Sequence, residues 1–171
     1  MINSEILLQQ EQQLLARKDY VPKTNHISKE IYIVDDNADY RYLTRKIFKE
    51  YLSEYKLQIF ERGQSLYQHL MLISADTYKG SLPGLILLDL DMPGIDGYNI
   101  LKLIRQRLNC KNIGWKTLPV MILTNNATNE QVFDCYNVGA TSVIFKPLGF
   151  DEQKDLFQLI CKYWLGYNKI F

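Results

Sequence analysis

The sequence predicts an α/β fold in which one parallel β-sheet carries helices on both faces. From residue 30 onward, short apolar segments alternate with segments in which apolar residues recur at helical spacing. The runs 85–88 and 119–123 are apolar without alternation, as is typical of parallel strands buried on both faces. Because crossovers between parallel strands are right-handed, this order predicts a doubly wound sheet of five strands.

Each element has its own signal. Leu43, Ile47 and Phe48 lie on one helical stripe, and Gly139 fits the left-handed position that often ends a helix. The expected strands are 31–34, 56–60, 85–89, 119–123 and 141–145. The expected helices are one through 43–48 and others at 64–73, 97–108, 128–138 and 151–164.

Residues 1–28 form an N-terminal extension, and the domain is expected at 29–171. Leu7 and Leu8 recur as Leu14 and Leu15, a seven-residue spacing that indicates one helical stripe before Pro22. We expect a helix resting on the domain. A partner-binding or coiled-coil segment is the alternative, since two heptads do not establish one.

Composition excludes several classes of protein. The 171 residues contain 20 Lys and Arg and 19 Asp and Glu, so a net charge of +1 favours neither nucleic acid nor an acidic membrane. There is no apolar stretch of bilayer length and no secretory signal pattern. The three cysteines form no CxxC pair, which favours a reducing cytoplasm.

Polar side chains follow four of the predicted strands. Taken singly, each has an ordinary explanation as a helix cap, a strand-end hydroxyl or a surface charge. Ligands of doubly wound sheets bind at the carboxyl ends of the strands, so these side chains are expected to converge there. They are Asp35, Asp36, Asp89, Thr124 and Lys146.

This combination favours phosphoryl-transfer chemistry. Three neighbouring carboxylates require a compensating cation, and oxygen ligands without His or thiolate favour Mg²⁺. Lys146 adds positive charge for a phosphoryl group, and Thr124 offers a hydrogen-bond donor. One carboxylate is then left to act as the nucleophile.

Four segments resemble the signature segments of response-regulator receiver domains, in the same order and each at a strand end. They are 31–36 (IYIVDD), 87–97 (LLDLDMPGIDG), 120–124 (VMILT) and 145–147 (FKP). The resemblance covers 31–164 and implies a flavodoxin-like sheet of order 2-1-3-4-5. The long loops and the ending Tyr163-Trp164-Leu165 are most similar to single-domain regulators associated with bacterial phytochromes.

The resemblance also implies a role for each site residue. Asp89 would accept a phosphoryl group from a sensor histidine kinase or a phosphotransfer protein. Asp36, Asp89 and the backbone carbonyl of Asp91 would bind Mg²⁺ directly, and Asp35 would act through water. Lys146 would neutralise the phosphoryl oxygens, and Thr124 would donate a hydrogen bond to one of them. A cis peptide bond between Lys146 and Pro147 is expected, and no enzymatic activity beyond the protein's own phosphorylation and dephosphorylation.

Three positions depart from the family pattern. Val143 stands where receivers often carry a switching aromatic ring, and Asn125 stands where a small residue is usual. Asp91 adds a carboxylate beside the site.

Two other functions remain open from the sequence. Asp89-Leu90-Asp91 also fits a haloacid-dehalogenase-like phosphatase, although the order of the acidic motifs and Pro93 argue against it. An unphosphorylated docking module is the second alternative, left open by Val143 and Asn125.

Signalling is expected to occur through protein contact, because residues 165–171 leave no room for an output domain. The face formed by 128–138, 141–145 and 151–164 is a candidate homodimer surface, since its last helix has more apolar residues than a core stripe needs. Coverage of that face by the N-terminal stripe or by 167–171 is the alternative.

Overall fold

The predicted five-stranded parallel sheet is present. The computed structural model describes residues 28–75, 78–80, 82–108 and 117–167, so the predicted N-terminal helix lies outside the described residues. The strands hydrogen-bond in the order β2-β1-β3-β4-β5, as predicted. They are β1 (Glu30–Val34), β2 (Lys56–Phe60), β3 (Leu85–Asp89), β4 (Val120–Thr124) and β5 (Ser142–Phe145).

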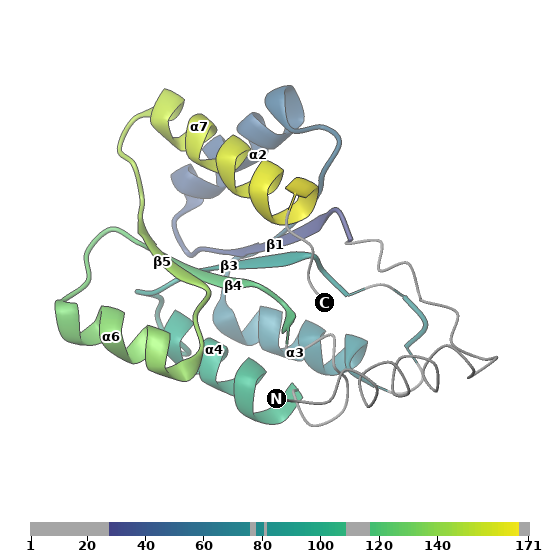
Figure 1. Ribbon diagram of the computed structural model, residues 1–171, viewed down its shortest axis with the longest axis vertical. Helices are drawn as coiled ribbons and strands as arrows, with labels where there is room; N and C mark the ends of the chain where they lie inside the picture. The colour runs from purple at the N-terminus through teal and green to yellow at the C-terminus, as the bar shows by residue number, and fades with distance from the viewer. Residues whose placement is uncertain (1–27, 76–77, 81, 109–116, 168–171) are drawn as a thin grey trace, which may run out of the picture.

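Helices cover both faces of the sheet (Figure 1). One face carries α2 (Ala38–Tyr51) and α7 (Phe150–Cys161), and the other carries α3 (Gly63–Ile73), α4 (Gly97–Leu103) and α6 (Asn129–Val138). Ile31 and Ile33 of β1 pack on the α2–α7 side, whereas Tyr32 and Val34 pack on the other. The alternation explains why the central strands are apolar throughout.

Local sequence sets the helix ends. The Asn37 side chain accepts a hydrogen bond from the Tyr40 amide at 3.0 Å and so caps α2. Thr128 and Gln131 form a capping box at the start of α6. Gly139, with φ of 109°, ends α6 in the left-handed region, as predicted.

Two predicted helices change their hydrogen bonding part of the way along. The helix expected at 97–108 is α-helical through Gly97–Leu103 and continues as the π-helix η1 (Ile104–Leu108). The last helix likewise continues from α7 into the π-helix η2 (Lys162–Tyr167). Within the described ranges, no helix is long and apolar enough to cross a membrane.

Strand register brings the predicted site together. Val34 pairs with Leu88, Asp89 pairs with Leu123, and Thr124 pairs with Phe145. The residue that follows or ends each of these strands therefore lies at one edge of the sheet. That edge borders the point between β1 and β3 at which the order of the strands reverses.

Candidate functional site

Three aspartates converge at the carboxyl edge of β1 and β3. One carboxylate oxygen from each of Asp35, Asp36 and Asp89 lies within 4.8 Å of the other two. Asp35 and Asp89 are buried, and Asp36 is exposed. The predicted convergence is therefore observed, and the cluster has an open side toward solvent.

Lys146 inserts its ammonium group between the two buried aspartates. Its Nζ donates a hydrogen bond to Asp35 Oδ2 at 2.7 Å and lies 2.9 Å from Asp89 Oδ1. The lysine side chain is only 2% exposed. One ammonium thus compensates part of the charge of three carboxylates.

The prediction of a cis bond before Pro147 is wrong for this structure. The peptide bonds of the described residues are all trans. Lys146 reaches both aspartates from this trans arrangement, so a cis bond is not needed to direct its side chain inward.

Arg41, which no sequence motif indicated, holds the loop that carries the first two aspartates. Its Nη1 donates to the backbone carbonyls of Asp35 at 2.9 Å and Asp36 at 2.6 Å. Its Nη2 lies 3.3 Å from a carboxylate oxygen of Glu61. An arginine near the start of a helix that follows two aspartates is the signal that could have identified it.

The hydrogen bonds distinguish Asp89 from Asp35. Both carboxylate oxygens of Asp35 are occupied, Oδ1 by the amide of Asn37 and Oδ2 by Lys146. Asp89 Oδ1 is buried and has its contact with Lys146 but no well-formed hydrogen bond within the described chain. Of the two buried aspartates, Asp89 therefore has the carboxylate oxygen with fewer hydrogen bonds to the protein.

Burial raises the pKa of Asp89 to about 6, against the lowering effect of the Lys146 ammonium. The nearby charge of Asp35 raises it further, and a backbone hydrogen bond at Asp91 lowers it. The surroundings thus destabilise the ionised form of Asp89, and added positive charge would stabilise it.

Thr124 lies at the same edge, and its hydroxyl is engaged within the loop that follows β4. Its hydroxyl donates to the backbone carbonyl of Asn126 at 2.8 Å and accepts from the Asn126 amide at 3.2 Å. A longer contact of 3.4 Å joins it to Asp91 Oδ2. Asn125 is exposed.

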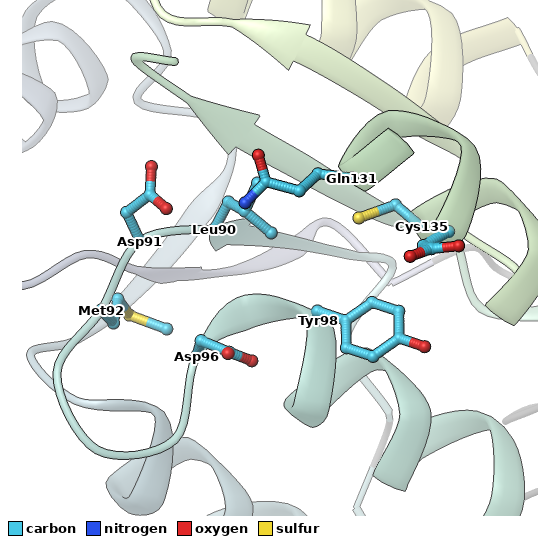
Figure 2. A pocket seen from close by; sticks show the side chains of 8 residues that line it. Leu90, Asp91, Met92, Asp96, Tyr98, Gln131 and Cys135 are labelled. Carbon is cyan, nitrogen blue, oxygen red and sulfur yellow. The ribbon is translucent and has the colours of Figure 1, made fainter. Parts of the chain in front are cut away.

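A cavity of about 500 Å³ lies beside the cluster, between the start of α4 and α6 (Figure 2). Its floor is apolar, from Leu90, Met92 and Cys135, and three aspartates line it. Asp91 is one of these, whereas the three clustered aspartates are not among the lining residues. The cavity therefore adjoins the cluster without containing it.

Comparisons with known proteins agree with this geometry. The family model described as the response regulator receiver domain matches residues 31–158. The probable methanogenesis regulatory protein FilR2 of Methanothrix harundinacea is 28% identical over 81% of this chain and 85% of the relative. The two-component response regulator ARR7 of Arabidopsis thaliana is 27% identical over 77% of this chain and 62% of its own length.

Solved structures show the same fold. The Mn²⁺-bound form of response regulator Rcp1 is 25% identical, with a TM-score of 0.67 over 83% of this chain and 98% of that one. The phosphorylated cyanobacterial phytochrome response regulator RcpA is 22% identical, with a TM-score of 0.70 over 84% of this chain and 98% of that one.

Proposed function

Because the chain belongs to the response regulator receiver domain family, we propose that it accepts a phosphoryl group on Asp89 and signals by contact with other proteins. One observation carries the proposal. Asp89 Oδ1 is buried without a well-formed hydrogen bond, 2.9 Å from Lys146 Nζ. The donor is a phosphohistidine on a sensor histidine kinase or a phosphotransfer protein.

The residues present fit Mg²⁺. Asp35, Asp36 and Asp89 supply three carboxylates, and Lys146 supplies one ammonium, so a divalent cation restores the balance of charge. Asp36, Asp89 and the Asp91 carbonyl are the expected direct ligands, with Asp35 acting through water. When bound, the ion would neutralise charge on the phosphoryl oxygens.

The chain's own residues divide the reaction among them. An Asp89 oxygen attacks phosphorus, and the P–O bond forms as the P–N bond of the donor breaks, returning the imidazole to the donor. The Lys146 ammonium balances charge on the transferred group. The Thr124 hydroxyl then turns from Asn126 and donates to a phosphoryl oxygen.

The phosphorylated state is recognised at the outer strand β5, which lies between α6 and α7 (Figure 1). Large apolar side chains are exposed here: Phe133 on α6 at 65%, Phe145 on β5 at 55%, Leu159 on α7 at 66%, and Tyr163 on η2, which continues α7, at 53%. We propose that two copies of the chain pair through this face once Asp89 is phosphorylated.

A cytoplasmic location is part of this proposal. Cys135 and Cys161 are free and buried, which suits a reducing compartment.

Carboxylates line both the cavity and the acidic cluster beside it, which disfavours nucleic acid as a partner at the carboxyl ends of the strands.

The phosphoryl transfer is tested with the full chain, acetyl phosphate and Mg²⁺, followed by intact mass measurement. The wild type should gain one phosphoryl group, and Asp89→Asn should gain none. Asp134→Asn, which changes an exposed aspartate on α6, is the matched control and should behave as wild type. Rapid multiple turnover would instead indicate a phosphatase, and no labelling would indicate a docking module.

Pairing is tested by sedimentation with and without beryllofluoride, on the full chain and on a variant that begins at Lys29. Dimers should form in both proteins with the phosphate mimic. Monomers in all four samples would refute the dimer, and loss of the dimer only in the shorter variant would move the interface to residues 1–28.

A further inference from the structure

Tyr40 lies against the lysine of the site. It stands in the first turn of α2, and the centre of its ring is 4.6 Å from Lys146 Nζ. A cation over an aromatic face is attracted by the ring, and the attraction strengthens when water is excluded. Because the Lys146 side chain is 2% exposed, the ring helps to hold the ammonium beside Asp89.

The Tyr40 hydroxyl is buried without a partner. Across the described part of the chain, three buried side-chain polar atoms lack a hydrogen bond: the Tyr40 hydroxyl, Arg41 Nε and Asp89 Oδ1. Arg41 holds the loop of the acidic cluster, so all three atoms belong to one region. Asp89 Oδ1 does keep its ion pair with Lys146. Buried polar atoms without a hydrogen bond are uncommon in native proteins, and their gathering here indicates a site that a ligand completes.

The hydroxyl is a donor close enough to Asp35 and Asp89 to feel their negative charge. Burial raises the pKa of Tyr40, and the charges of Asp35 and Asp89 raise it further. The phenol therefore keeps its proton at neutral pH, and its proton has no acceptor among the residues described. A phosphoryl group on Asp89 would bring three acceptor oxygens to the region of Lys146 and Tyr40.

We propose that Tyr40 is a phosphoryl-binding residue, whose hydroxyl donates a hydrogen bond to the group carried by Asp89 while its ring positions Lys146. This inference rests on the proposed function. It assigns to α2 a direct part in stabilising the phosphorylated state, in addition to the groups at the strand ends.

The test measures the affinity of the full chain for beryllofluoride with Mg²⁺ by calorimetry. Tyr40→Phe keeps the ring over Lys146 and removes only the hydroxyl, so affinity should fall about tenfold, as expected for a hydrogen bond to a charged group. Tyr40→Leu removes both contributions and should lose more. Affinity for Mg²⁺ alone should not change in Tyr40→Phe.

Tyr51→Phe is the matched control. Tyr51 lies at the other end of α2, and its ring also faces a lysine, with Lys154 Nζ at 5.5 Å from its centre. This variant should bind beryllofluoride as wild type does. The stability of unliganded Tyr40→Phe should equal or exceed that of wild type, because the change removes a buried hydroxyl that has no partner.

The outcomes separate the inference from the proposed function. If wild type binds beryllofluoride and Tyr40→Phe binds equally tightly, the inference is wrong and the function stands. If wild type does not bind it, both are overturned. If Tyr40→Phe unfolds more readily but keeps full affinity, the tyrosine is only structural and the inference again fails.

Discussion

Replacing Asp89 by asparagine should stabilise the unliganded protein at neutral pH. Burial raises the pKa of this carboxyl from 3.8 to about 6, because desolvation outweighs the contact with Lys146. The folded chain therefore binds the proton more tightly than the unfolded chain does. Ionising Asp89 then lowers the free energy of unfolding, and a neutral side chain of similar shape avoids that loss.

The magnitude follows from the size of the shift. The rise of the pKa from 3.8 to about 6, at about 1.4 kcal/mol for each pKa unit, lowers the free energy of unfolding of wild type by about 3 kcal/mol above pH 6. Since the folded pKa lies above the unfolded one, the loss grows between about pH 4 and pH 6 and is absent below that range. The variant's advantage should therefore be largest at pH 8 and small at pH 4.

Urea unfolding in EDTA, at several values of pH, measures this difference. Asp134→Asn serves as the control, because it removes an exposed carboxylate on α6 and should change stability by less than about 0.5 kcal/mol. Added Mg²⁺ should narrow the gap, since the ion binds more tightly to, and so stabilises more, the chain that retains the Asp89 carboxylate. A variant less stable than wild type at pH 8, or an advantage that does not change with pH, would refute the reasoning.

Three further predictions concern the same edge of the sheet. Asp36→Ala should lose most of the stabilisation that Mg²⁺ gives in a thermal melt, whereas Thr124→Ala should keep it; equal metal affinity in both would contradict the assignment. Gly97→Ala should destabilise the fold and reduce phosphorylation, because a Cβ at this position would clash with the backbone oxygen of Asp89. Arg41→Met should weaken Mg²⁺ binding by about tenfold, since the carbonyl oxygens of both aspartates after β1 lose their hydrogen bonds to Arg41 Nη1; unchanged calorimetric affinity would show that the loop holds its shape without them.

The sequence predicts those site residues that stand at the ends of strands. Asp35, Asp36, Asp89 and Lys146 each follow or end an apolar run, and parallel strands bring their carboxyl ends to one edge. Their convergence follows from the order of elements alone. The strand order was predicted from the resemblance to receiver domains, and the role of Gly139 from the preference of glycine for the left-handed position that ends a helix.

The parts that the sequence does not predict depend on how helices rotate against the sheet. Tyr40 and Arg41 belong to α2, and nothing in the periodicity of that helix shows that both turn back toward the aspartates. The orientation of Thr124 is likewise set by the loop that follows it, because its hydroxyl bonds within that loop. The π-helical turns after Leu103 and Cys161 also leave no mark in an apolar stripe.

The loop after β4 connects the site around Asp89 with helix α6, part of the face proposed for pairing. Val143 has no ring to rotate, and it packs partly buried against the α3–α4–α6 side of the core. The Thr124 hydroxyl has one proton, so donating it to a phosphoryl oxygen breaks the bond to the Asn126 carbonyl. Asn126 lies two residues before Thr128, the N-cap of α6, and α6 carries the exposed Phe133. We therefore expect displacement of this short loop to carry a change at Asp89 to the face proposed for pairing.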